Sequence, residues 1–124
     1  EMNESLPTKV TIATGERLDM VSMTYGDVTV SAGGDGGDVQ EYVFEDGEYI
    51  TSMTLSKVKK TAFGTYRVSY VKLVTNYGNV IEGGTYRSGK STTYTAPEGY
   101  AIAGFHGHCG DEIDRLGAIY LLVE

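Results

Sequence analysis

Two short segments of the chain place an aspartate four residues after a glycine: residues 15–19 read Gly-Glu-Arg-Leu-Asp, and residues 110–114 read Gly-Asp-Glu-Ile-Asp. A glycine lets a loop turn sharply and leaves the next backbone amides uncovered. An ionised aspartate offers only acceptors. Donor amides beside acceptor oxygens suit a small polyhydroxyl ligand, because each sugar hydroxyl both donates and accepts. The plainer interpretation is that Asp19 and Asp114 only brace their own turns, and the presence of two copies weakens it.

A second glycine-rich element, Gly-Gly-Asp-Gly-Gly-Asp, occupies residues 33–38. A phosphate-binding loop is excluded, because no Gly-Lys-Ser/Thr follows. A calcium-binding β-helix nonapeptide would need an apolar residue at Gln40 and tandem copies, and the sequence has neither. The remaining interpretation is a bare backbone platform beside residues 15–19, where a ligand approaches the main chain closely.

The segment that contains His106, His108 and Cys109 gathers residue types that ligate zinc or act as nucleophiles. On a strand the two histidines share one face and Cys109 lies on the other, so the three do not easily meet one ion. A Cys–His nucleophile pair also needs an oriented third partner, and the sequence identifies none. We therefore predict no metal, no cofactor and no catalytic residues.

Strand signals dominate the chain, and they must position these loops. Short β-branched and aromatic segments alternate with Gly-, Asn- and Asp-containing turns, which predicts ten to twelve short strands of a sandwich, barrel or prism. Only residues 110–122 could carry a helical turn or two. Residues 25–28, Tyr-Gly-Asp-Val, recur 52 positions later as residues 77–80, Tyr-Gly-Asn-Val, and the pair Gly33-Gly34 recurs as Gly83-Gly84. Three four-stranded units of this kind would use the available length and bury their apolar faces together.

Composition limits the partner classes. The chain has 124 residues with 10 basic and 17 acidic side chains, a formal net charge of −7, which disfavours nucleic acid and anionic membranes as partners. Its 17 glycines accompany only 2 prolines, so collagen is excluded. Neither a transmembrane stretch nor the features of a signal peptide are present. We interpret residues 57–60, Lys-Val-Lys-Lys, as a solvated strand edge, with a partner contact as the alternative.

Several motifs together resemble the jacalin-related lectins, in that family's order and from about Val10 to the C-terminus. They are Gly33-Gly34-Asp35-Gly36-Gly37, Glu45-Asp46-Gly47-Glu48-Tyr49-Ile50, Val74-Thr75-Asn76-Tyr77-Gly78, Gly104-Phe105-His106-Gly107, the segment from Gly110 to Gly117, and Tyr120-Leu121. The resemblance implies an all-β fold, the β-prism I, with three four-stranded Greek-key sheets in pseudo-threefold symmetry. It also implies carbohydrate binding without catalysis or metal.

The resemblance further implies the site residues. The primary carbohydrate site would comprise Gly15, Glu16, Arg17, Asp19, Gly36 and Gly37. Asp19 would accept from two sugar hydroxyls, the amides of Glu16 or Arg17 and of Gly37 would donate, and the Arg17 side chain would flank the ring. A secondary site would comprise Gly110, Asp111, Glu112 and Asp114, without the glycine-rich partner that the family has near its N-terminus. In the third repeat either Ser69 or Val71 takes the place of the acid, depending on a gap, so that site is lost.

The family contains mannose/glucose-type and galactose-type binders, and the galactose type has a freed N-terminal glycine. This chain begins with Glu1, which favours mannose-type glycans. A more distant resemblance to the lectin modules of secreted bacterial cytolysins and biofilm-matrix proteins suggests that residues 1–124 are one extracellular module of a longer protein. Whether the chain forms an oligomer is open. The alternative function is a structural or protein-interaction β domain that binds no sugar.

Overall fold

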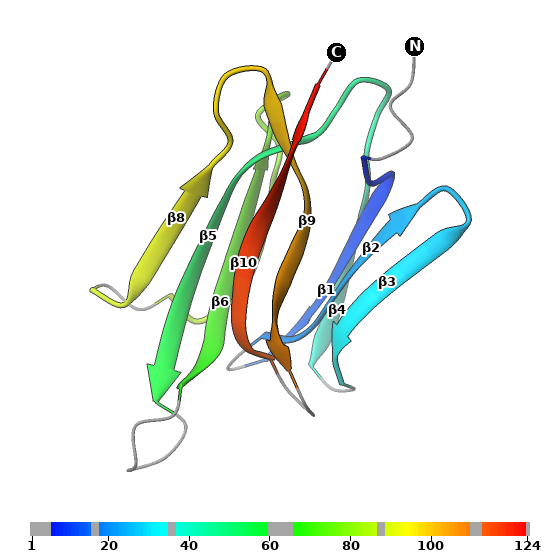
Figure 1. Ribbon diagram of the computed structural model, residues 1–124. Helices are drawn as coiled ribbons and strands as arrows, with labels where there is room; N and C mark the ends of the chain where they lie inside the picture. The colour runs from blue at the N-terminus through cyan, green and yellow to red at the C-terminus, as the bar shows by residue number, and fades with distance from the viewer. Residues whose placement is uncertain are drawn as a thin grey trace.

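The computed structural model describes residues 6–15, 18–34, 37–59, 66–86, 89–109 and 113–123. Within these ranges the chain forms ten antiparallel strands and no helix, as the turn spacing predicts (Figure 1). The strands are β1 (Lys9–Thr14), β2 (Leu18–Tyr25), β3 (Val28–Gly33), β4 (Asp38–Val43), β5 (Ile50–Lys59), β6 (Tyr66–Thr75), β7 (Val80–Gly84), β8 (Ser91–Thr95), β9 (Tyr100–Cys109) and β10 (Ile113–Leu122). The helical turn considered for residues 110–122 is wrong, because β10 occupies most of that segment.

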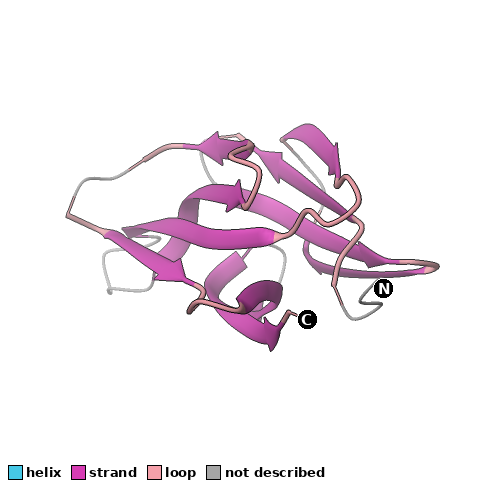
Figure 2. Ribbon diagram, turned by 90° about the horizontal axis from the view of Figure 1, so that it is seen from above, coloured by secondary structure: helices cyan, strands magenta, loops and turns pink. Residues whose placement is uncertain are grey.

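Two groups of four strands share one connectivity. The first sheet has the order β3-β2-β1-β4, and the same order recurs as β7-β6-β5-β8. In both, three consecutive strands pair in turn and the fourth returns beside the first, which is a Greek key. The hairpin of β9 and β10 follows the pattern of β1 and β2. Among the described residues, its strand pairing with the second group consists of Ile50 opposite Ile102. Seen from above, the sheets surround a common interior (Figure 2).

The core lies in that interior and receives side chains from each of the repeated units. Its largest fully buried aliphatic residues come from β1, β2, β5, β6 and β9: Val10, Ile12, Leu18, Met23, Ile50, Met53, Val68, Val71, Leu73 and Ile102. Each such side chain contributes roughly 1.5–3 kcal/mol when it leaves water. Since neighbouring side chains on a strand face opposite ways, the apolar face of each sheet points inward and the polar face outward.

A β-bulge marks the same place in each of the three hairpins. The register between the first and second strand shifts in every case, because the second strand has one extra residue near its start. These residues are Asp19 in β2, Ser69 in β6 and Asp114 in β10. A bulge bends its strand and re-aims the extra side chain. The pseudo-threefold repeat is therefore defined by the bulges, which lie at the ends of the hairpins shown at the bottom of Figure 1.

The repeat has a different register from the one that the sequence indicates at the second turn. Tyr25 ends β2 opposite Val28, and Thr75 takes the corresponding place, because its amide donates to the Asn79 carbonyl at 2.9 Å. The second turn therefore has one more residue, and Tyr77 lies at its exposed tip. Residues 25–28 and residues 77–80 therefore share the residue types of a turn, but they do not occupy equivalent positions on the strands.

Two further expectations concern the surface. Lys57 is exposed, but β5 is flanked by β6 and β8, so its inner position does not fit the predicted strand edge. Lys60 and the side chain of Lys59 lie outside the described residues. No helix in the described part of the chain is long and apolar enough to cross a membrane.

Candidate functional site

The backbone of Asp19 is held by the start of the β3–β4 loop. The Gly34 amide donates to the Asp19 carbonyl at 2.9 Å. Gly33 lies over the same carbonyl with φ +98°, and a Cβ atom there would come within 2.2 Å of the Asp19 oxygen. Only glycine fits this position, because both the positive φ and the close approach exclude a side chain. The start of the glycine-rich loop and the bulge at Asp19 are thus brought together.

The carboxylate of Asp19 lies beside two further glycines. A Cβ atom on Gly37 would approach Asp19 Oδ2 to 2.6 Å and the Thr14 carbonyl carbon to 2.7 Å, and Gly37 has φ +75°. On the other side, a Cβ on Gly15 would be 3.8 Å from the same oxygen. The half-buried carboxylate is therefore flanked by bare backbone from the β1–β2 and β3–β4 loops. Among the other predicted residues of this site, Glu16, Arg17 and Gly36 lie outside the described residues.

The predicted secondary site falls mostly outside the described residues. Gly110, Asp111 and Glu112 are not described, and for Asp114 only the backbone is. That backbone occupies the bulge of β10 and is equivalent to Asp19 of β2. The structure therefore places the two predicted aspartates at corresponding positions of the repeat.

The same position in the second sheet has no carboxylate. The bulge of β6 carries Ser69, whereas Val71 is 1% exposed and belongs to the core. The Thr85 amide donates to the Ser69 carbonyl at 2.7 Å, and the Ser69 hydroxyl donates to the Thr85 carbonyl at 2.9 Å. Gly84 has φ +92°, and a Cβ atom there would come within 2.2 Å of the Ser69 oxygen, just as one on Gly33 would approach the Asp19 oxygen. The backbone of the site is reproduced here without its acid, and Ser69 is the residue that replaces it.

His106, His108 and Cys109 belong to β9, and their side chains are not described. In the part of the chain whose side chains are described, no three His, Cys, Asp or Glu residues are grouped as metal ligands.

Sequence reasoning missed a buried polar cluster at the opposite end of the sheets. Glu48 is only 4% exposed, and four groups donate hydrogen bonds to its carboxylate. The donors are the Tyr42 hydroxyl at 3.0 Å, the Glu45 amide at 3.0 Å, the Thr75 hydroxyl at 2.7 Å and Asn79 Nδ2 at 2.7 Å. Burial alone would raise the pKa of Glu48, but these hydrogen bonds lower it below its ordinary value. The cluster ties the turn before β5 to the β6–β7 turn.

Comparison with known proteins matches residues 1–119 to the family model described as "Jacalin-like lectin domain". A Malaysian banana lectin is 33% identical, with a TM-score of 0.81 over 96% of this chain and 84% of that chain. A mannose-binding jacalin-related lectin from Ananas comosus is 20% identical, with a TM-score of 0.77 over 100% of this chain and 87% of that one. These likenesses confirm the predicted β-prism I fold.

A curated relative, "Secreted RxLR effector protein 19" from Plasmopara viticola, is 36% identical over 81 residues, which are 59% of this chain and 41% of that protein. The chain thus spans about two fifths of this relative's length. Lectins bind carbohydrate without transforming it, and the prediction that the chain is not an enzyme agrees with this. The family match covers nearly the whole sequence, and the bulges and glycine loops repeat in the way the fold requires. The chain belongs to the jacalin-like lectin domain family.

Proposed function

We propose that the chain binds mannose-type glycans non-covalently, chiefly at Asp19. The observation that carries this proposal is the half-buried Asp19 carboxylate, which lies between the bare backbone of Gly15 and Gly37. Two acceptor oxygens beside uncovered main chain suit a pair of vicinal sugar hydroxyls, since each hydroxyl donates to the carboxylate and accepts from an amide. Glu16 and Arg17 supply amides or a flanking side chain, and Gly36 extends the platform.

Asp114, with Gly110, Asp111 and Glu112, forms a secondary site in this proposal. Its support is the equivalent backbone bulge in β10. The mannose preference is supported by the Ananas comosus lectin, which is described as mannose binding. An extracellular location is supported by the Plasmopara viticola relative, which is described as secreted.

Replacing Asp19 with serine is expected to abolish most sugar binding and leave the fold intact. The second sheet already carries Ser69 at this bulge, so the backbone tolerates the residue. Each lost charge-assisted hydrogen bond is worth roughly 1.5–3 kcal/mol, which is about tenfold or more in affinity. Isothermal titration calorimetry with methyl α-mannoside would measure the change from an expected constant of about 1 mM.

The matched control is Asp27→Ser, an exposed aspartate in the β2–β3 turn at the other end of β2. It should bind as the wild type does. If Asp19→Ser binds normally and Asp114→Ser does not, the order of the two sites is reversed. If no glycan on an array binds the wild-type chain, the structural or protein-interaction alternative holds. Binding that EDTA abolishes would contradict the metal-independent proposal.

Replacing Gly37 with alanine is expected to abolish binding at Asp19 without removing any side chain. The new methyl would meet Asp19 Oδ2 at 2.6 Å and displace the carboxylate. Gly26→Ala is the matched control, because Gly26 has a similar φ of +66° and nothing within 4 Å of its added Cβ. Gly26→Ala should lose about 1 kcal/mol of stability from backbone strain, and Gly37→Ala should lose more, because its methyl would also meet the Thr14 carbonyl carbon at 2.7 Å. At a temperature where both variants are folded, only Gly37→Ala should lose methyl α-mannoside binding. Equal binding by the two variants would argue against a site between Gly37 and Asp19.

A further inference from the structure

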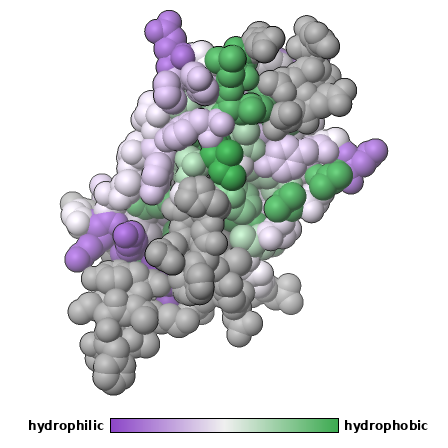
Figure 3. Space-filling model, viewed as in Figure 1, coloured by the Kyte–Doolittle hydropathy of each residue, from purple (hydrophilic) through white to green (hydrophobic). Residues whose placement is uncertain are grey.

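Basic residues are concentrated in one part of the chain. Residues 57–90 contain seven of the ten lysines and arginines but only one of the 17 acidic residues. The remainder of the chain is therefore strongly acidic. The first residues of this segment belong to the end of β5 and its last residue precedes β8, so both lie toward the lower left of Figure 1. Strongly hydrophilic residues gather on that side of the surface in Figure 3.

Lys57 and Lys90 are exposed and lie opposite each other on neighbouring strands. They continue the register in which Ser56 faces Ser91, and the Lys57 amide donates to the Lys90 carbonyl at 3.0 Å. Directly opposite residues have Cβ atoms about 4.5–5.5 Å apart, and like charges there destabilise a sheet. An anion that contacts both ammonium groups would offset this repulsion, because each group donates charge-assisted hydrogen bonds to it.

The corresponding end of the first sheet has the opposite charge. The strand pairings make Lys57 the equivalent of Thr14, and Lys90 the equivalent of Asp38. The bulge of β6 likewise carries a serine where the bulge of β2 carries an aspartate. At these positions the first sheet therefore has two carboxylates, whereas the second has two ammonium groups and no carboxylate.

The main chain beside Lys90 is open to a ligand. Gly89 is the equivalent of Gly37, and the two have similar φ values of +80° and +75°. A Cβ atom on Gly37 would meet Asp19 Oδ2 at 2.6 Å, whereas one on Gly89 would have no atom of the described residues within 4 Å. An anionic group can therefore approach the second sheet from the side on which the first sheet places a carboxylate of its own.

Tyr86 adds an exposed aromatic ring to this end of the second sheet. It is 56% exposed, and its ring packs at 83° against that of Tyr70, with 5.5 Å between the centroids. Tyr70 is opposite Ser56 of β5, which is opposite Ser91 of β8. Tyr70 thus lies about 10 Å, two inter-strand spacings, from the strand end beside Lys90. A tyrosine ring suits the apolar face of a sugar, because it presents an apolar body and a polar tip.

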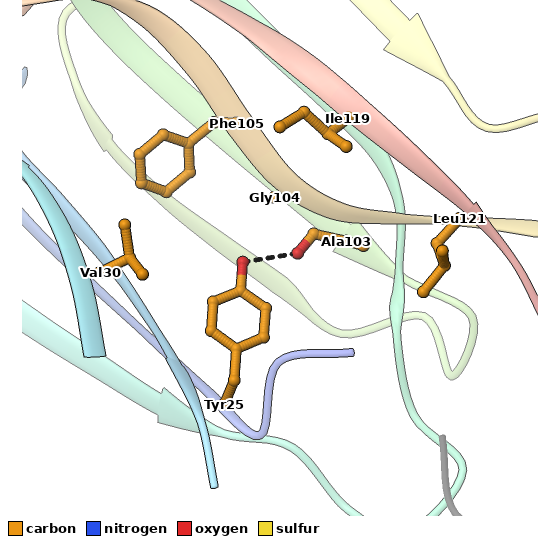
Figure 4. Close-up of a pocket in the computed structure, with 7 residues that line it drawn as sticks. All are labelled: Tyr25, Val30, Ala103, Gly104, Phe105, Ile119 and Leu121. Atoms are coloured by element: carbon orange, nitrogen blue, oxygen red, sulfur yellow. Dashed lines mark hydrogen bonds between the residues drawn. The ribbon is translucent and has the colours of Figure 1, made fainter. Parts of the chain in front are cut away.

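A pocket of about 370 Å³ between β3 and the β9–β10 hairpin is a less suitable place for an anion. Among the lining residues labelled in Figure 4, Tyr25 is the one with a polar side chain, and its hydroxyl donates to the Ala103 carbonyl at 2.6 Å. The lining therefore offers no charged group to a ligand.

We propose that Lys57 and Lys90 bind a sulfate group of an acidic glycan, with Tyr86 against a neighbouring sugar ring. A sulfate ester is ionised at every ordinary pH and offers three acceptor oxygens, enough for two ammonium groups. Nucleic acid is disfavoured, because its closely spaced phosphates would meet the acidic remainder of the chain. In a glycan the charged groups are separated by uncharged parts of the sugar rings. This site does not depend on the one proposed at Asp19.

The test is isothermal titration calorimetry of the chain with a heparin-derived hexasaccharide at low salt. Lys57→Gln and Lys90→Gln should each weaken binding by about tenfold. Added salt should weaken binding by the wild type, because it screens exposed charges. Lys9→Gln is the matched control, since it removes the same charge from the first sheet, where Lys9 pairs with Glu41 at 3.1 Å.

Tyr86→Ala should also weaken hexasaccharide binding, and Tyr77→Ala, which removes an exposed tyrosine from the β6–β7 turn, should not. Circular dichroism establishes that each variant is folded. The proposal is overturned if the wild type does not bind, if a Lys57→Gln/Lys90→Gln double variant binds equally well, or if unsulfated heparosan or single-stranded DNA binds as tightly. Methyl α-mannoside binding should be unchanged in the lysine variants, and hexasaccharide binding unchanged in Asp19→Ser, so that failure of one site is distinguishable from failure of the other.

Discussion

Replacing Glu48 with glutamine is expected to lower the free energy of unfolding by about 3 kcal/mol, one of the largest losses available to a near-isosteric change. All four polar neighbours of this buried side chain point a hydrogen toward it. Only an ionised carboxylate accepts all of them, because it has two oxygens and no hydrogen of its own. A glutamine side chain keeps one acceptor oxygen and turns an NH₂ group toward Asn79 Nδ2 or the Thr75 hydroxyl, which leaves buried donors unsatisfied.

The loss extends beyond the four direct bonds, because the cluster is connected. The Thr75 hydroxyl also accepts from the amides of Tyr77 and Asn79, both at 3.2 Å. Asn79 Nδ2 donates to the Tyr42 hydroxyl at 2.8 Å as well. Removing the charge therefore loosens the link between two turns that are distant in sequence. Urea unfolding followed by circular dichroism would measure the change, and Glu98→Gln, at an exposed position, is the control with an expected change below about 0.5 kcal/mol.

The contribution of Glu48 should depend on pH in a defined direction. Because its pKa is lower in the folded chain than in the unfolded chain, the carboxylate stabilises the fold above the unfolded pKa of about 4.3. This stabilisation is lost as the pH falls through the folded pKa. The difference in unfolding free energy between wild type and Glu48→Gln should accordingly be full at pH 7 and shrink below about pH 4. A difference that is constant with pH would show that Glu48 does not act through its charge.

Replacing Gly33 or Gly84 with alanine is expected to destabilise the chain by about 3 kcal/mol or more, and to nearly the same extent in both cases. At each position the added Cβ would lie 2.2 Å from a backbone oxygen, that of Asp19 or that of Ser69. Backbone at both ends of this contact is fixed by a hydrogen bond, from Gly34 to Asp19 and from Thr85 to Ser69. The φ values of +98° and +92° add strain of their own.

Thermal unfolding would compare the two variants, and a sugar titration at low temperature would separate them. Gly84→Ala should retain methyl α-mannoside binding while it is folded, because its sheet has no acid at the bulge. Gly33→Ala should lose it, since the contact that it disturbs holds Asp19. The reverse pattern, with binding lost only in Gly84→Ala, would move the sugar site to the second sheet. Gly26→Ala again reports the strain of a positive φ without a clash.

The strands and turns of this fold follow from local patterns in the sequence. Glycine turns such as those at Gly47 and Gly99 were predictable because only glycine readily adopts their φ values of +78° and +86°. The pairing of the Gly33–Gly37 segment with Asp19 was predictable from the repeat and the family resemblance. Neither inference required knowledge of which distant strands pair.

Two features could not be predicted, and each depends on register. A bulge adds a residue without any signature in residue type, so the choice between Ser69 and Val71 required the pairing of β5 with β6. The hairpin of β5 and β6 continues to Lys59 and Tyr66. It therefore extends past the bulge, and the second repeat has no short Gly-x-x-x-Asp loop by which the bulge could be recognised. Glu48 follows a turn, where an acid usually faces water. It is buried because Thr75 and Asn79, which are distant in sequence, donate hydrogen bonds to its carboxylate.

The backbone contacts at the bulge have a consequence for how such domains evolve. In the first two sheets the carbonyl of the bulge residue, Asp19 or Ser69, lies against a glycine and accepts a hydrogen bond from an amide of the next loop. Neither contact to this carbonyl involves the side chain of the bulge residue. The scaffold therefore accepts either an aspartate or a serine there. One substitution at such a position can create or delete a point of ligand attachment while the surrounding architecture persists. The number of attachment points per molecule is free to vary by mutation, much more readily than the fold that displays them.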